Sequence, residues 1–298
     1  MSINVEPVLK SADPLIRLAL DEDLGAQGDI TSQALVPWEQ SAKVNIVSRE
    51  AGVLCGVILI PQIYSALTQR LGKPDVQVDV RQFVSDGDVI EPGTVVASVT
   101  GPVQLLLSGE RVVLNFLIHL SGIASRTATF VKKAGDTGVA ILDTRKTLPG
   151  YRLLHKYAVR CGGGTNHRIG LFDGMLIKDN HLAAQPTPSV ADAVSVARDY
   201  LHRQSLDLPV EVEVDSLEQL RNALQQRPEI VLLDNMKPTE LKQAVTIRNE
   251  LSPQTLLEAS GGVSLETIGC IAASGVDRIS IGALTHSAPA LDLGYDWP

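Results

Sequence analysis

The second half of the chain repeats one pattern, in which a short apolar run is followed in most cases by a segment with helical spacing. The runs end in charged, small or glycine residues, and six are found: AILDTRK, MLIKDN, PVEVEVD, EIVLLDN, TLLEASGG and RISIGAL. Such alternation is typical of parallel strands that are buried on both faces. Because no G-x-G-x-x-G follows the first run, the pattern favours an α/β barrel, with a doubly wound open sheet as the alternative.

Capping signals place the helices between these strands. Ser216 and Gln219 have capping-box spacing, a second helix is expected to begin at Thr239, and a third to run from a cap at Ser264 to a stop at Gly275. The segment around Pro186 is expected to be a surface loop.

The first hundred residues have a different pattern. Asp13 followed by Pro14 predicts a helix start, with a stop at Gly25. The β-rich segments KVNIVSR, VQVDVRQF and TVVASVTG lie around a helix predicted near 60–70. They predict an α+β sandwich. The segment VSDGDVIEPGTVVASVTG also looks like half of a biotinyl or lipoyl carrier domain, but it has no Lys at an exposed hairpin tip.

Residues 108–134 have helical spacing and predict one long connecting helix, or a helix pair that is interrupted near Ser121 and Gly122. We therefore expect an N-terminal α/β sandwich domain at 1–115 and a barrel domain at 116–285. The tail 286–298 is a candidate to pack back on the first domain.

Composition excludes several classes of function. A net charge of −8, a pI near 5.3 and 4% aromatic residues argue against a nucleic-acid partner. The three cysteines form no C-x-x-C pair, which indicates reduced thiols in a cytoplasmic protein. The N-terminus lacks the pattern of a signal peptide, and no membrane anchoring is expected.

Positive charge gathers in residues 143–181, where seven Lys or Arg stand against three Asp in an otherwise acidic chain. Four of these cations flank apolar runs: Arg145, Lys146, Arg168 and Lys178. They predict a pocket for a small molecule with several negative charges. The other three, Arg152, Lys156 and Arg160, are spaced four apart and predict a solvated helix face.

Carboxylates follow at the ends of the middle strands. In a barrel, strand ends share one mouth, so Glu213 and Asp234 would lie close together and repel each other unless a cation lies between them. Oxygen ligands with substrate phosphates suit Mg²⁺. The alternative is an internal ion-pair network with Lys146 and Lys178.

The last two strands end in small residues whose N–H groups can approach an anion, in Ser260–Gly262 and Ile281–Ala283. Together with a helix start after Ser264, they predict a phosphate cradle. Cations, a metal-binding carboxylate pair and a phosphate cradle fit phosphoribosyl transfer better than acyl or hydride transfer.

The ordered set of motifs resembles the quinolinate phosphoribosyltransferase family. The resemblance extends over nearly the whole length, with no departure at the motif positions. It rests on EDLGAQGDIT, ERVVLNFL, DTRKTLPG, RCGGGTNHRIGLFDGMLIKDNH, EVEVDSLEQ, LLDN, EASGG and SIGALTH.

The resemblance implies an N-terminal α+β sandwich domain, an incomplete α/β barrel, and a homodimer in which Arg111 completes the neighbouring site. It implies that quinolinate and phosphoribosyl pyrophosphate give nicotinate mononucleotide, pyrophosphate and CO₂ on the de novo route to NAD. The alternatives are a transferase for a related pyridine or pyrimidine carboxylate, a lyase with a Schiff base at Lys178, and a non-catalytic sensor of phosphoribosyl pyrophosphate.

The family's residue roles carry over to matching positions. Lys146, Glu213 and Asp234 would be catalytic, and the last two would handle Mg²⁺. The quinolinate carboxylates would be bound by Arg111, Arg145, His167 and Arg168, with Thr144 beside them and Lys146 and Lys178 near both substrates. The 5′-phosphate would be held by Ser260, Gly261, Gly262, Ile281, Gly282 and Ala283.

Overall fold

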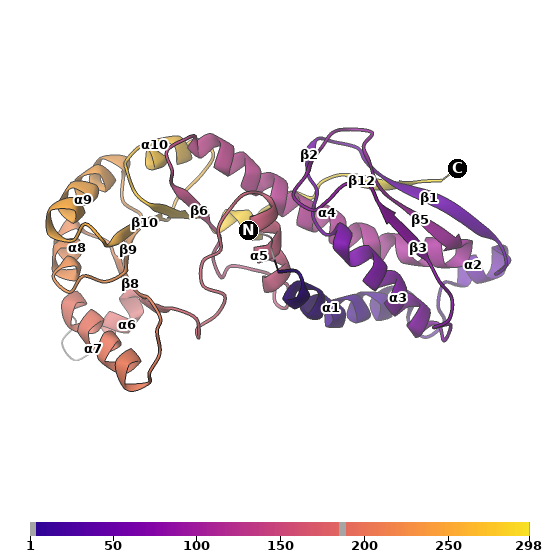
Figure 1. Ribbon diagram of the computed structural model, residues 1–298, viewed down its shortest axis with the longest axis horizontal. Coiled ribbons are helices and arrows are strands. Elements are labelled where there is room, and N and C mark those ends of the chain that lie inside the picture. The colour runs from indigo at the N-terminus through magenta and orange to yellow at the C-terminus, as the bar shows by residue number, and fades with distance from the viewer. Residues whose placement is uncertain (1–3, 185–188, 298) are drawn as a thin grey trace. The chain divides into compact units, whose positions relative to one another are not determined.

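The computed structural model describes residues 4–184 and 189–297, and the loop expected near Pro186 lies outside these ranges. The chain divides into two compact units (Figure 1). The first comprises Met1–Ala128, Thr147–Gly163 and Ala283–Pro298, and the second Thr129–Lys146 and Gly164–Gly282. The expected boundary after residue 115 falls inside a helix, and the first unit also includes two later segments of the chain.

The first unit is built on an antiparallel sheet with the order β12-β1-β5-β3. Its strands are β1 (Ser41–Ser48), β3 (Asp79–Gln82), β5 (Val95–Pro102) and β12 (Leu293–Asp296), and a small second sheet pairs β2 (Gly52–Val53) with β4 (Val89–Ile90). Its helices are α1 (Glu6–Leu24), α2 (Ile30–Leu35), η1 (Val57–Leu59), α3 (Ile60–Arg70), α5 (Arg152–Cys161) and α11 (Ala283–His286). The tail pairs with β1, from Asn45 opposite Asp296 to Ser48 opposite Leu293.

Helix α1 begins at Glu6, so the start predicted at Asp13 was wrong, while the stop at Gly25 is confirmed. Pro14 lies inside the helix. A buried stripe continues on both sides of it: Val8, Ala12, Ile16, Leu20 and Leu24. Burial of this stripe compensates for the backbone hydrogen bond that Pro14 cannot donate.

Helix α4 (Val103–Ala134) is one continuous helix, which confirms the long connecting helix and excludes the pair interrupted near Gly122. Ser121 Oγ instead accepts a hydrogen bond from the Cys55 N–H at 2.9 Å, and a Cβ at position 122 would overlap the Pro289 carbonyl. Gly122 therefore permits the Pro289 carbonyl to lie close to the backbone of α4. By length and composition α4 could cross a membrane, but 56% of its most apolar window is buried inside the protein, as in the core helix of a globular domain.

The second unit contains six parallel strands in the order β6-β11-β10-β9-β8-β7, which confirms the α/β fold class. They are β6 (Ala140–Leu142), β7 (Met175–Ile177), β8 (Val210–Val214), β9 (Ile230–Asp234), β10 (Leu256–Ser260) and β11 (Arg278–Ser280). Helices lie on the outer side of the strands in Figure 1. Within the described residues β6 and β7 are the edges and do not pair, so the barrel is incomplete.

The helices of this unit are α6 (Asp179–Ala183), α7 (Val190–Arg203), α8 (Leu217–Leu224), α9 (Pro238–Leu251) and α10 (Ile268–Ala272). The Ser216 cap is confirmed, since its Oγ accepts from the Gln219 N–H at 3.4 Å. Helix α9 begins one residue before Thr239. The helix predicted from Ser264 was too long, because Ser264 Oγ accepts from the Glu266 N–H at 3.2 Å and forms a turn there.

The solvated face predicted for α5 is also only partly correct. Arg160 is exposed, but Lys156 is 3% exposed and lies among buried neighbours. Spacing alone did not distinguish the two positions, because α5 is packed on most of its surface.

Candidate active site

The carboxyl ends of β9 and β10 meet in register, with Asp234 beside Ser260. The Asn235 N–H donates to the Ser260 carbonyl at 2.8 Å. Gly261 and Gly262 follow with φ of 89° and 59°, and a Cβ on Gly261 would overlap the Asn235 side chain. Only glycine fits at Gly261 without strain, and two left-handed residues in a row can leave backbone N–H groups open to an anion.

Lys178 follows β7 directly, and its Nζ forms an ion pair with Glu213 Oε2 of β8. This contact is part of the internal ion-pair network that was the alternative to metal binding. Asp234 Oδ2 accepts from Asn235 Nδ2 at 2.7 Å. Glu213, Asp215 and Asp234 line a cavity of about 760 Å³. These hard oxygen donors suit Mg²⁺ that is also held by substrate phosphates.

Two arginines come together in the second unit. Burial lowers the pKa of Arg168, and the positive charge of Arg145 lowers it further. Arg168 Nη1 donates to the Gly174 carbonyl at 2.8 Å, whereas Arg145 is exposed. Two guanidinium groups that repel each other can share an anion that lies between them.

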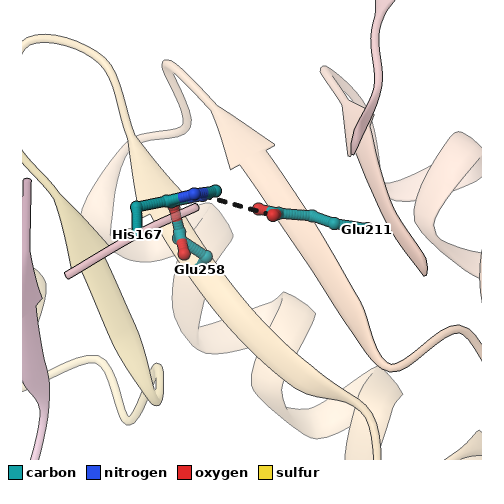
Figure 2. A group of neighbouring side chains, drawn as sticks. All are labelled: His167, Glu211 and Glu258. Atoms are coloured by element: carbon teal, nitrogen blue, oxygen red, sulfur yellow. Dashed lines mark ion pairs between the residues drawn. The ribbon is translucent and has the colours of Figure 1, made fainter. Parts of the chain in front are cut away.

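His167 lies next to Arg168 and contacts two buried carboxylates (Figure 2). Its Nε2 is 3.2 Å from Glu211 Oε2 and 3.3 Å from Glu258 Oε1, and Glu258 Oε2 is 2.7 Å from Arg278 Nε. Burial alone lowers the pKa of His167, but the hydrogen bonds and charges of the two carboxylates outweigh it and raise the pKa to about 9.

Nδ1 of the same ring accepts the Arg168 N–H at 2.7 Å, which requires an unprotonated Nδ1. This contact opposes the raised pKa of His167. Two charge-assisted contacts outweigh one neutral hydrogen bond, so we expect the ring to be cationic near pH 7, a state in which Nδ1 carries a proton and no longer accepts the Arg168 N–H. In either state Nε2 is directed at Glu211 and Glu258.

The backbone around His167 is held by Asp143, which is fully buried at the end of β6. Asp143 Oδ1 accepts the His167 N–H at 2.9 Å, and Oδ2 accepts Asn166 Nδ2 at 2.6 Å. His167, Arg168, Glu211 and Arg278 line a second cavity of about 360 Å³. The segment 166–168 is therefore tied to the strands at several points.

The remaining expected residues are placed differently. Thr144 is half-buried and its Oγ1 accepts the Lys146 N–H at 3.1 Å, while the Lys146 side chain is exposed. The Ile281 N–H donates to the Leu142 carbonyl at 2.9 Å, so it is already engaged, while Gly282 ends the second unit.

Ala283 and Arg111 belong to the first unit. The Arg111 side chain is 65% exposed, with Glu110 at 3.9 Å.

Sequence reasoning gave no role to Glu258 or Arg278. A signal was available, because both are charged residues at the start or centre of apolar strands, TLLEAS and RISI. A carboxylate that is 0% exposed is stable only with partners, and its position in a buried strand predicts a network.

Comparison with known proteins gives consistent matches. Residues 29–121 match the family model described as quinolinate phosphoribosyl transferase, N-terminal domain, and residues 123–296 match that of its C-terminal domain. A protein of Mycobacterium leprae (strain TN) named nicotinate-nucleotide pyrophosphorylase [carboxylating] is 45% identical, over 96% of this chain and 97% of its own length.

Solved structures agree with the sequence matches. The crystal structure of NadC from Streptococcus pyogenes has a TM-score of 0.88 at 37% identity and full coverage of both chains. Nicotinate-nucleotide pyrophosphorylase from Francisella tularensis has a TM-score of 0.85 at 36% identity, with 97% of each chain covered. Since both halves match in order and the relatives align over nearly their full lengths, the chain belongs to the quinolinate phosphoribosyl transferase family.

Proposed function

We propose that the protein transfers the phosphoribosyl group from phosphoribosyl pyrophosphate to quinolinate, with loss of CO₂, and forms nicotinate mononucleotide and pyrophosphate for NAD synthesis. Family membership and the names of the relatives support the reaction. The observation that carries the proposal is the arrangement within the second unit. It contains a pair of arginines for carboxylates, and carboxylates beside a glycine cradle at the strand ends.

In the reaction the pyridine nitrogen forms a bond to the anomeric carbon while the bond from that carbon to the pyrophosphate oxygen breaks. Positive charge builds up on the ribose ring, and carboxylates fixed nearby stabilise it. We assign this role to Glu213 and Asp234. Lys146, whose side chain is exposed, and Lys178 would neutralise the departing pyrophosphate.

Decarboxylation then follows from the new bond. The alkylated nitrogen is positively charged, so it stabilises the carbanion that remains when the adjacent carboxylate leaves as CO₂. A proton replaces the lost carboxylate. The protein mainly has to bind the diacid, and we assign its carboxylates to Arg145 and Arg168, with Thr144 and His167 beside them.

The 5′-phosphate of the ribose would be held at Ser260, Gly261 and Gly262, where the two left-handed glycines support an open cradle. We keep Ile281, Gly282 and Ala283 as the second side of the phosphate site. Because the Ile281 N–H already donates to the Leu142 carbonyl, the contacts to the phosphate would come from its neighbours Gly282 and Ala283.

Mg²⁺ is part of the proposal. Glu213 and Asp234 would hold it, directly or through water and substrate, and when bound it supplies charge neutralisation for the pyrophosphate. The carboxylate lining of the 760 Å³ cavity supports this assignment.

We further propose that the protein is a cytoplasmic homodimer in which Arg111 completes the neighbouring site. The exposed guanidinium and the free cysteine thiols support these two parts of the proposal. Mixing an Arg111→Ala variant with a Lys178→Met variant tests the shared site. Mixed dimers would retain one intact site and recover part of the activity, and no recovery despite subunit exchange would remove the role of Arg111.

The reaction is tested by measuring CO₂ and pyrophosphate released from quinolinate, with Mg²⁺ present and after chelation. We expect equal amounts of both products, and a large loss of rate without Mg²⁺. Nicotinate, which has one carboxylate, is the matched control and should react poorly. Product release from nicotinate but not from quinolinate would overturn the proposal.

A further inference from the structure

Glu211 and Glu258 place two buried carboxylates around one ring nitrogen of His167. Their exposed fractions are 4% and 0%, and they come from different strands, β8 and β10. An oxygen of one carboxylate lies within 4.8 Å of an oxygen of the other, so the two negative charges would repel each other strongly in a dry environment. The cations that contact them in the described part of the chain are His167 and Arg278.

His167 transmits this arrangement to Arg168. Its ring nitrogen Nδ1 lies 2.7 Å from the Arg168 backbone nitrogen, so the ring contacts that backbone directly, and the His167 backbone N–H donates to Asp143. Movement of the ring would therefore shift the backbone from which the Arg168 side chain extends. Arg168 is the half-buried arginine of the pair proposed to bind the diacid.

We propose that Glu211 and Glu258 are positioning residues that clamp His167 between β8 and β10 and so hold Arg168 in place for a substrate carboxylate. This inference rests on the proposed function for the identity of the substrate. The clamp itself rests on the distances from His167 Nε2 to Glu211 Oε2, 3.2 Å, and to Glu258 Oε1, 3.3 Å. Preorganised binding groups of this kind reduce the entropy lost when a ligand binds.

The same three side chains have the arrangement of a metal site, since their ligand atoms lie within 4.8 Å of one another. Charge balance favours the clamp. Arg278 neutralises one carboxylate and a cationic His167 the other, so the buried group is neutral without a metal ion. Among the described residues, Glu211 Oε1 and Glu258 Oε1 are both buried without a hydrogen-bond partner, which is an expected cost when two carboxylates lie around one ring nitrogen.

The test compares Glu258→Gln and Glu211→Gln with Glu240→Gln, an exposed charge change at the start of α9. Glutamine keeps the size and one acceptor oxygen but loses the charge. We expect the quinolinate KM to rise about tenfold or more in the first two variants, while the phosphoribosyl pyrophosphate KM changes less than twofold. Glu258→Ala should be worse than Glu258→Gln. Equal rises of both KM values, or an unchanged quinolinate KM, would overturn the clamp.

A second readout needs no substrate. The ¹⁵N ring signals of His167, assigned by their loss in His167→Gln, should shift in Glu211→Gln and Glu258→Gln but not in Glu240→Gln. Unshifted signals contradict the clamp even if a variant is inactive. An inactive wild type with the expected shifts contradicts the proposed function and leaves the clamp standing. Stoichiometric metal that wild type retains and Glu258→Gln loses would replace the clamp with a metal site.

Discussion

The histidine pair in the first unit should make that unit sensitive to acid. His155 is fully buried, and its Nε2 lies 2.8 Å from Nε2 of His119. Its Nδ1 is buried and finds no hydrogen-bond partner within residues 4–184 and 189–297. Burial, and then the charge of His119, lower the pKa of His155 to about 3. Burial also lowers the pKa of His119.

The size of the effect follows from the two states of His155. Its pKa is about 6.5 in an unfolded chain and about 3 in the folded one, so above pH 6.5 neither state takes up the proton. Below pH 6.5 the unfolded chain binds a proton that the folded chain does not bind. The free energy of unfolding therefore decreases as the pH is lowered. The loss is about 2 kcal/mol at pH 5 and at most about 5 kcal/mol near pH 3.

Both tryptophans, Trp38 and Trp297, belong to the first unit, so their fluorescence during denaturant unfolding reports on that unit. We expect the free energy of unfolding to fall by about 2 kcal/mol more between pH 7 and 5 in wild type than in His155→Gln. His286→Gln, at an exposed position of the same unit, is the control and should follow wild type. Identical pH slopes for wild type and His155→Gln would refute the reasoning.

Three further outcomes are expected. Arg278→Met should destabilise the second unit by about 3–5 kcal/mol in denaturant unfolding, because it leaves the carboxylate of Glu258 buried without its guanidinium partner; a loss below about 1 kcal/mol would contradict this. Gly261→Ala should raise the phosphoribosyl pyrophosphate KM, since a Cβ overlaps Asn235 at a positive φ, and an unchanged KM would remove Gly261 from the phosphate cradle. Arg145→Ala should weaken quinolinate binding by about 2–5 kcal/mol, measured by calorimetry; unchanged affinity would exclude a direct contact.

Sequence reasoning was most reliable where local pattern and tertiary structure require the same thing. Parallel strands are buried on both faces, so all six strands of the second unit were visible as apolar runs. It was least reliable where distant residues decide. Gly122 resembles a helix break, but the Pro289 carbonyl that requires the glycine comes from the far end of the chain. Pro14 resembles a helix start, but burial on both sides of it extends α1.

The strand-end residues of the expected site lie near one another for a related reason. Residues at the carboxyl ends of parallel strands lie at one edge whatever the details of packing, so Glu213, Asp234 and Ser260 could be grouped from the sequence. Glu258 was not grouped with them, because it lies in the middle of β10 and not at its end. Its partner Arg278 begins β11, where a charged residue is usually solvated.

The register of the strands relates the clamp to the proposed catalytic residues. Side chains two apart on a strand point to the same face, so Glu211 lies beneath Glu213, and Glu258 beneath Ser260, each by about 7 Å. The carboxylates of Glu211 and Glu258 are neutralised by His167 and Arg278. Because His167 and Arg278 balance the buried carboxylates, the more exposed cations near the strand ends do not have to neutralise them. A chain that lost the lower carboxylates would therefore keep its strand-end groups and still bind the diacid weakly.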